Sequence, residues 1–140
     1  MILLGRKEDD AIYNQIFPYF SNDIIYLGEH KDARAFINIS DAFCLASLWE
    51  GMPITIIEAF SVGCPAIVTP VGGCVNMVED GVNGFLVDDV SEDSYYQSLK
   101  RFVSLSEEER KQMKVNALKS YKNQYSIEKT CKDYINLFLT

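Results

Sequence analysis

Two glutamates occupy the positions in this chain that are best placed for chemistry. Glu50 follows an apolar run at residues 42–46, and Glu58 lies inside the apolar segment 54–62, with seven residues between the two acids. A carboxylate in apolar surroundings is costly unless a partner satisfies it. The hydroxyl groups of a ligand are suitable partners for Glu58, and both acids can border one cavity.

Structural explanations for both glutamates stay open at the level of sequence. Glu58 can instead bond a backbone amide, or a Lys or Arg side chain. Glu50 lies just before a helix, where a carboxylate favours the helix dipole by roughly 0.3–1 kcal/mol and needs no ligand. A helix as apolar as residues 54–62 must be largely buried, so Glu58 needs a partner under either explanation.

Short apolar runs and helical segments must position these residues. Strands are expected at residues 2–4, 23–27, 42–46, 65–69 and 85–87. Helices are expected at residues 8–17, 32–39, 54–62 and 75–79, and from Ser91 onward. Ser106 has the pattern of a capping box with Glu109, and Ser126 is expected to start the last helix. The run 42–46 is typical of a strand buried on both faces.

Alternation of apolar strands and helices predicts the fold class. The pattern is that of an α/β fold, a Rossmann-like parallel sheet with helices on both faces. Ligands of such sheets bind beyond the C-terminal ends of the strands. Three loops are expected at that edge, at residues 28–32, 47–53 and 69–75.

Length and composition limit the class of protein. A chain of 140 residues that is 48% hydrophobic can form one core, which favours a single domain over residues 1–140. No apolar run approaches the ~18 residues that cross a bilayer. The formal charge of −7 argues against a nucleic-acid-binding surface, although backbone amides of an acidic protein can still hold a phosphate group.

The cysteines point to a reducing compartment. Cys44, Cys64, Cys74 and Cys131 are isolated from one another, and His30 is the only histidine. This spacing does not resemble a zinc site, so we expect reduced, mostly buried thiols and a cytoplasmic protein.

A series of short motifs then resembles a known family. Ser47-Leu48-Trp49-Glu50-Gly51-Met52-Pro53 leads into Glu58-Ala59-Phe60, followed by Gly63-Cys64-Pro65, Thr69-Pro70-Val71-Gly72-Gly73 and Asp80-Gly81-Val82-Asn83-Gly84. The E-x7-E pair alone is weak, but with G-x-P, T-x-x-G-G and D-G-x-x-G at these intervals it is specific. The chain resembles the C-terminal domain of the retaining, GT-B-fold glycosyltransferases of family 4, the glycosyl transferases group 1.

The resemblance implies a role for each residue of the middle loop. Glu50, as the catalytic residue, would hydrogen-bond the donor sugar and stabilise positive charge at its anomeric carbon. Glu58 would hold the ribose hydroxyls of the nucleotide. The remaining substrate-binding residues implied are Gly51, Met52, Ile54, Thr55, Gly72 and Gly73, with the Ile54 and Thr55 amides on the diphosphate. His30 and Lys31 would lie near the base, although both are equally compatible with a solvent-facing surface.

Two parts of a typical family member are missing from this chain. The segment Ile2-Leu3-Leu4-Gly5 resembles the second strand of the family's C-terminal domain, so the first strand-helix unit and its basic residues are absent. The acceptor-binding N-terminal domain is absent too, and Arg6 lies too far along to be taken as a substitute. We therefore expect donor binding without turnover by this chain alone, and self-association through the exposed strand and apolar surface.

The resemblance also implies the partners. A nucleoside-diphosphate sugar would be the donor and a sugar or glycolipid the acceptor, with the full-length protein peripheral to the inner membrane face. No metal or cofactor is implied, because no D-x-D motif is present. A non-catalytic nucleotide-binding or scaffold module and a nucleotide-sugar 2-epimerase are the alternatives. The epimerases lack the combined E-x7-E and T-x-x-G-G arrangement.

Overall fold

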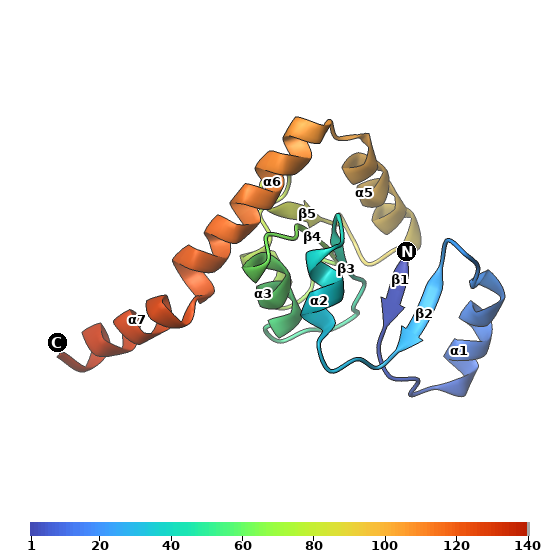
Figure 1. Cartoon of the computed structure of the whole chain (residues 1–140), viewed down its shortest axis with the longest axis horizontal. Coiled ribbons are helices and arrows are strands. Elements are labelled where there is room, and N and C mark those ends of the chain that lie inside the picture. The colour runs from blue at the N-terminus through green and yellow to red at the C-terminus, as the bar shows by residue number, and fades with distance from the viewer. Residues whose placement is uncertain (140) are drawn as a thin grey trace. The chain divides into compact units, whose positions relative to one another are not determined.

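Five short strands, all paired in parallel, organise residues 1–139, which are the residues that the computed structural model describes. They are β1 (Ile2–Leu4), β2 (Ile25–Gly28), β3 (Phe43–Leu45), β4 (Ala66–Val68) and β5 (Gly84–Leu86). Each lies at an apolar run that was expected to form a strand (Figure 1). The chain divides after Ala35 into two units, which are described separately below. The prediction of one domain over residues 1–140 stays a prediction.

The first unit contains a two-stranded sheet and one amphipathic helix. β1 pairs with β2, with Ile2 opposite Ile25. Between the strands lie α1 (Asp10–Ile16) and the short helix η1 (Phe17–Tyr19), and the Asp9 carboxylate caps α1 by accepting bonds from its first N–H groups. Four rings pack against one another within this unit and supply much of its apolar contact: Tyr13, Phe17, Phe20 and Tyr26.

The second unit is built on the three-stranded sheet β3-β4-β5. Alternate residues of the central strand point to opposite faces. Ala66 and Val68 join a cluster with α3 (Ile54–Ser61) and α4 (Cys74–Met77), whereas Ile67 joins a cluster with α5 (Glu92–Ser104). Helices therefore cover both faces of a parallel sheet, which confirms the predicted fold class.

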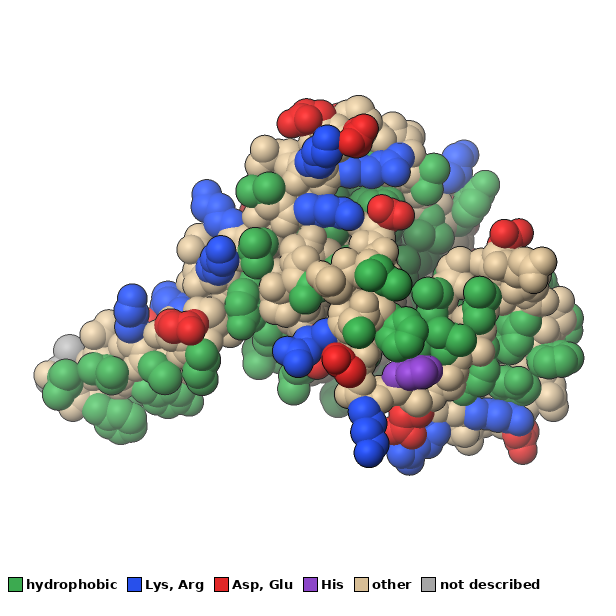
Figure 2. Space-filling model, viewed as in Figure 1, with side chains coloured by type: hydrophobic (Ala, Val, Ile, Leu, Met, Phe, Trp, Pro, Cys, Tyr) green, Lys and Arg blue, Asp and Glu red, His purple; other side chains and the backbone are tan. Residues whose placement is uncertain are grey.

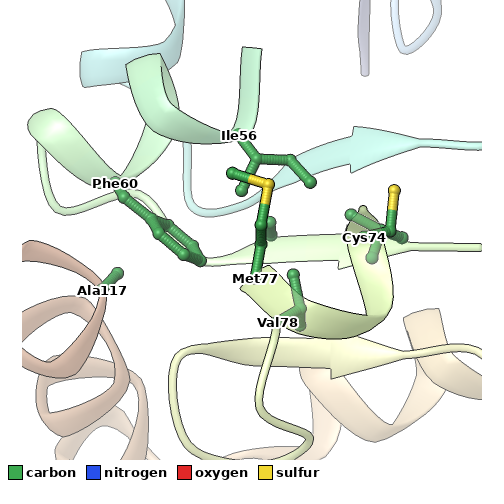
Figure 3. Packing of buried hydrophobic residues seen from close by; sticks show 8 residues of the cluster. Ile56, Phe60, Cys74, Met77, Val78 and Ala117 are labelled. Carbon is green, nitrogen blue, oxygen red and sulfur yellow. The ribbon is translucent and has the colours of Figure 1, made fainter. Parts of the chain in front are cut away.

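The main core lies on the α3 face of the sheet. Ile56 and Phe60 of α3 are fully buried there, against Met77 of α4 and Ala117 of α6 (Glu107–Ser120), as Figure 3 shows. Fully burying side chains of this size is worth roughly 1.5–3 kcal/mol each. This packing fixes α3 on the sheet and so fixes where its N-terminus points.

The C-terminal helices begin where the sequence predicts. The Ser106 hydroxyl accepts a bond from the Glu109 N–H, and the Glu109 carboxylate accepts one from the Ser106 N–H, which completes a capping box for α6. Ser126 caps α7 (Ile127–Leu139) through the Lys129 N–H. Between the two helices, residues 121–125 form a single π-helical turn, η2 (Tyr121–Tyr125), which sequence patterns did not indicate.

The structure corrects three expectations about burial. β3 is not buried on both faces, because it is an outer strand of its sheet and Cys44 is exposed on it. Only Cys64 and Cys74 are buried thiols, so the prediction of mostly buried cysteines holds for half of them. The helix at residues 54–62 was expected to be largely buried, but only one of its faces is: Ile56, Ala59 and Phe60 are buried, whereas Ile54 is 66% exposed. Among residues 1–139, no helix is long and apolar enough to cross a membrane.

Candidate functional site

Hydrogen bonds connect the loops that follow β3 and β4, and they hold Glu50 in place. The Ser47 hydroxyl donates to the Glu50 carboxylate at 2.6 Å. The Thr69 hydroxyl at the end of β4 donates to the Ser47 carbonyl, also at 2.6 Å. Glu50 is half-buried. A carboxylate held by a charge-assisted bond and a second supporting contact has a restricted orientation, as a site residue requires.

The glycine pair after β4 packs directly on the backbone of the Glu50 loop. The Gly73 N–H donates to the Gly51 carbonyl at 2.7 Å. A Cβ at Gly72, whose φ is +48°, would stand 1.7 Å from the Glu50 carbonyl oxygen, and one at Gly73 would stand 2.4 Å from the Gly51 oxygen. Only glycine permits this approach, so Gly72 and Gly73 set the position of the Glu50 loop.

The N-terminus of α3 leaves backbone donors unused. Its N-cap, Pro53, makes no side-chain capping bond, and Pro53 is itself buried. Ile54 and Thr55, the first two helical residues, are exposed, and the N–H groups of a first turn have no intrahelical acceptor. Such a terminus carries partial positive charge and is suited to an anion.

Glu58 lies on the open face of α3. Ile56, Ala59 and Phe60 form the buried face, and helical periodicity places Ile54 and Glu58 on the opposite side. Glu58 is therefore half-buried, and not deep in the core as the apolar composition of the helix indicated. Within residues 1–139, its carboxylate makes no hydrogen bond or ion pair. The structural explanation, a bond to a backbone amide or a basic side chain, is not realised here.

The negative charge of Glu50 acts on the thiol of Cys74, the first residue of α4. Burial raises the pKa of the Cys74 thiol, and the negative charge of Glu50 raises it further. Among residues 1–139, Ser47 is the one side chain that donates a hydrogen bond to the Glu50 carboxylate, which keeps acceptor capacity for another partner.

Two cavities of about 440 Å³ lie elsewhere on the second unit. One is lined by charged residues around Asp41 and Arg110, and the other by Leu48, Thr69 and residues at the start of α5. Neither is lined by Glu50 or Glu58. That the two acids border one cavity stays a prediction.

The residues that were expected near the nucleotide base lie in the first unit. Arg6 forms an exposed ion pair with Glu29, with 3.2 Å between nitrogen and oxygen. A ring nitrogen of His30 lies 3.1 Å from the Leu27 carbonyl, and Lys31 is exposed. The two units are not placed relative to each other, so the roles of His30 and Lys31 stay predictions.

No metal-ligand cluster is present in the part of the chain that the structure describes. Across residues 1–139, no three His, Cys, Asp or Glu side chains gather closely enough to hold an ion. The expectation that no metal is needed rests on the sequence and is not tested by this observation.

Three site residues were not identified from the sequence. Ser47 and Thr69 hold the loop, and Trp49, which is 83% exposed, stands directly before Glu50. Ser47 precedes Glu50 by three residues, a spacing that permits a local side-chain contact. The bond from Thr69 joins residues 22 positions apart and has no sequence signal.

Comparison with known proteins places these loops in a family. Residues 5–120 match the family model described as glycosyl transferases group 1. The chain is 37% identical over 98 residues to an Escherichia coli protein named UDP-Gal:alpha-D-GlcNAc-diphosphoundecaprenol alpha-1,3-galactosyltransferase. That alignment covers 69% of this chain and 25% of the relative. The chain thus spans about a quarter of that curated protein.

Solved structures show the same fold. A glycosyltransferase from Rickettsia africae superposes with a TM-score of 0.85 at 21% identity, covering 98% of this chain and 38% of that one. Anabaena Alr3699/HepE in complex with UDP-glucose superposes with a TM-score of 0.81 at 22% identity, covering 99% and 40%. At these identities the likeness shows the fold alone. The family model covers most of the chain, including every loop described above for the second unit, and the chain belongs to the glycosyl transferases group 1 family.

Proposed function

We propose that this chain binds a nucleoside-diphosphate sugar as the donor-binding part of a retaining glycosyltransferase. The observation that carries the proposal is the junction of three elements: the Glu50 loop held by Ser47, the uncapped N-terminus of α3, and Glu58 on the open face of that helix. The chain spans 25% of the E. coli relative, so the transfer step is proposed for a full-length protein and donor binding for this chain.

The proposed donor lies along α3 from its N-terminus. The Ile54 and Thr55 N–H groups receive the diphosphate, with the Thr55 hydroxyl as a third donor. Glu58, one turn along the open face, accepts bonds from the ribose hydroxyls and thereby gains the partner it lacks within the protein. Gly51 and Met52 line the approach between sugar and diphosphate.

Glu50 is proposed to act on the sugar. Its carboxylate accepts bonds from the sugar hydroxyls and stabilises the positive charge that develops at the anomeric carbon as the nucleoside diphosphate departs. Gly72 and Gly73 contribute by setting the distance of the Glu50 loop, which is the kind of positioning on which such a reaction depends. No metal or other cofactor is part of the proposal.

We further propose an acceptor and a location for the full-length protein. The acceptor is a sugar or a lipid-linked saccharide, which the name of the E. coli relative supports because it contains a diphosphoundecaprenol-linked sugar. The proposed location is the inner membrane face, where a lipid-linked acceptor would be reached. We also propose that the chain self-associates. Phe43 and Leu45 make their ladder bonds to β4, so the Cys44 N–H and carbonyl point to an open edge of β3.

Titration calorimetry tests the donor site, with Trp49 fluorescence as a local reporter. UDP, UDP-glucose and UDP-galactose are the first probes, because the relatives' names contain UDP-sugars, and GDP and ADP are the comparison. Glu58→Ala should weaken UDP binding roughly 10- to 100-fold, the effect of losing bonds to a charged group. Glu50→Ala should leave UDP binding unchanged and abolish any difference between UDP and UDP-sugars. Glu108→Ala, a substitution at an exposed position of α6, is the control.

The outcome of these titrations distinguishes donor binding from the alternative functions. UDP affinity that is unchanged in Glu58→Ala would remove the ribose role. Absence of binding by the unsubstituted chain to every nucleotide would favour the non-catalytic scaffold over the donor-binding module. The family match supports the transferase over the epimerase, and product analysis of a full-length protein with a UDP-sugar distinguishes the two directly.

A further inference from the structure

A cavity of about 440 Å³ in the second unit is lined by charged residues that the proposed function does not use. Four of these residues belong to the first two turns of α6, and the fifth lies two residues before β3. Figure 2 shows Lys and Arg side chains gathered over α6 at the top of the view, with acidic side chains among them. The lining residues are three bases and two acids: Arg110, Lys111, Lys114, Asp41 and Glu107.

This cavity is separate from the proposed donor site. Asp41 lies just before β3, whereas Glu50 follows the same strand. A Cβ at Gly63, in the turn before β4, would lie 3.3 Å from the Lys114 carbonyl oxygen, so α6 also passes the start of β4. The strands are parallel, so the cavity lies at their amino-terminal edge, and the donor site lies beyond their carboxyl ends. A ligand in the cavity would occupy a second site.

Positive charge is concentrated in the part of the chain that forms this cavity. Residues 100–140 contain nine bases and five acids, whereas residues 1–99 contain four bases and fifteen acids. Within the cavity, three bases face two acids. A local excess of positive charge attracts anions even where the whole protein is acidic.

Arg110 has a fixed orientation at the side of the cavity. Its Nε donates to the Leu105 carbonyl at 3.1 Å, and its Nη2 donates to the Val103 carbonyl at 2.7 Å. The guanidinium carbon lies 5.8 Å from the centre of the Phe102 ring. Arginine has five N–H donors, so these two bonds leave others for a ligand. Within residues 1–139 no acid forms an ion pair with Arg110, and a positioned guanidinium of this kind is suited to phosphate.

The two lysines can reach the same ligand. Lys111 and Lys114 are three residues apart, which places them on one side of α6. Lys111 pairs with Glu107 at 2.7 Å between nitrogen and oxygen, and Lys114 lies 3.8 Å from Asp41. Exposed ion pairs contribute little, whereas a bond between an ammonium group and a phosphate is charge-assisted at both ends. A phosphate that enters the cavity can therefore draw both ammonium groups from the carboxylates.

We propose that this cavity binds a phosphate monoester of a small polyol. The three bases hold the phosphate group. The Asp41 and Glu107 carboxylates, which can only accept hydrogen bonds, accept them from the hydroxyl groups of the ligand. A bare phosphate would leave these two acids facing a like charge. The volume of about 440 Å³ exceeds the needs of one phosphate group and lies in the usual range of small-molecule sites, about 300–1,000 Å³.

Titration calorimetry of the full chain with glycerol 3-phosphate tests the proposal. The expected dissociation constant is on the order of 0.1–1 mM, with inorganic phosphate at least ~5-fold weaker and no binding of glycerol. Lys111→Glu and Lys114→Glu should each raise the constant at least ~10-fold. Lys119→Glu makes the same change of charge at an exposed position of α6 outside the cavity and should stay within ~2-fold. The Lys111 side chain is 63% exposed, so its substitution should not change thermal unfolding, which circular dichroism checks.

The remaining arms separate this cavity from the donor site and from general attraction of anions. Saturating UDP should leave the affinity unchanged. Binding that UDP displaces and that Lys111→Glu retains would place the phosphate at the donor site and overturn the proposal. Equal losses in Lys111→Glu and Lys119→Glu would overturn it as well, as would no binding up to ~20 mM. UDP titration of the same variants reports the donor site separately, so either proposal can fail without the other.

Two further comparisons identify the ligand. Inorganic phosphate that binds as tightly as glycerol 3-phosphate would overturn the role given to the two carboxylates. Vesicles containing phosphatidic acid present the same phosphate monoester on a lipid. Co-sedimentation with these vesicles that is lost in Lys111→Glu and kept in Lys119→Glu would support the cavity and assign its ligand to a lipid headgroup. Binding of glycerol 3-phosphate without co-sedimentation would support the cavity with a free ligand.

Discussion

Replacing Gly72 by alanine tests whether the glycine pair sets the position of the Glu50 loop. A Cβ at Gly72 would lie 1.7 Å from the Glu50 carbonyl oxygen and 2.7 Å from its carbonyl carbon. Both atoms belong to backbone, so no side chain can rotate away. The Glu50 loop must retreat by roughly 1.3 Å or more to restore an ordinary contact.

The expected loss of folding free energy in Gly72→Ala has two parts, and two other glycines of the chain serve as controls. Alanine at a left-handed φ costs roughly 1–2 kcal/mol, and forcing atoms into a packed contact costs about 1–3 kcal/mol more. Gly81 has a φ of +75° and no atom within 4 Å of a Cβ, so Gly81→Ala measures the backbone part alone. Gly51 has neither feature, so Gly51→Ala should fall within about 0.5 kcal/mol of the unsubstituted chain.

Urea unfolding followed by circular dichroism and by Trp49 fluorescence gives the three free energies. We expect Gly72→Ala to lose about 3 kcal/mol, Gly81→Ala between about 1 and 2 kcal/mol, and Gly51→Ala almost nothing. Because Trp49 is next to Glu50, its folded-state emission should shift in Gly72→Ala and not in Gly81→Ala. Equal losses for Gly72→Ala and Gly81→Ala would refute the reasoning, because the contact with Glu50 would then contribute nothing.

Two further predictions concern the carboxylate and a buried thiol. Ser47→Ala removes the bond to Glu50 and should weaken UDP-sugar binding roughly 3- to 10-fold without changing UDP binding, whereas Ser61→Ala, which loses only a bond to a backbone carbonyl, should change neither. Burial raises the pKa of the Cys64 thiol from 9.0 to about 12, so between these pH values the folded protein keeps a proton that the unfolded chain has lost. Stability should therefore fall as pH rises through this window, by at most ~1.4 kcal/mol per pH unit from this group, and Cys64→Ala should remove that part of the slope in urea titrations.

Local patterns predicted the elements of this fold well. The positions of all five strands follow from short apolar runs between turn residues, and the caps at Ser106 and Ser126 follow from the residue three positions later. These features are visible in sequence because their causes lie within a few residues of one another. Burial is different. Whether Cys44 is covered depends on which strands neighbour β3, and the apolar runs do not contain that information.

The residue types of the candidate site could be named from the sequence, and the contacts that support them only in part. The spacing from Glu50 to Glu58 and the start of the helix after Pro53 could be read from the sequence. The helix at residues 54–62 was expected to be largely buried, but only one face of α3 is, because Ile54 and Glu58 share its open face. The Thr69 bond to the Ser47 carbonyl connects two loops that are distant in sequence, so only the folded sheet shows it.

The carboxylates and the glycines of this site have separable functions, and the structure indicates how. Gly72 and Gly73 touch backbone of the Glu50 loop, so their effect is on where that loop lies and not on what it can bond. Glu50 and Glu58 are half-buried, and neither side chain packs in a core cluster, so their replacement should change ligand binding more than stability. Substitutions at the two kinds of position should therefore affect different quantities. Glycine variants should lose folding free energy, whereas glutamate variants should lose donor affinity in a protein that still folds. A Glu50→Ala chain as unstable as Gly72→Ala would mean that the carboxylate is structural, and the chemical role proposed for it would have to be given up.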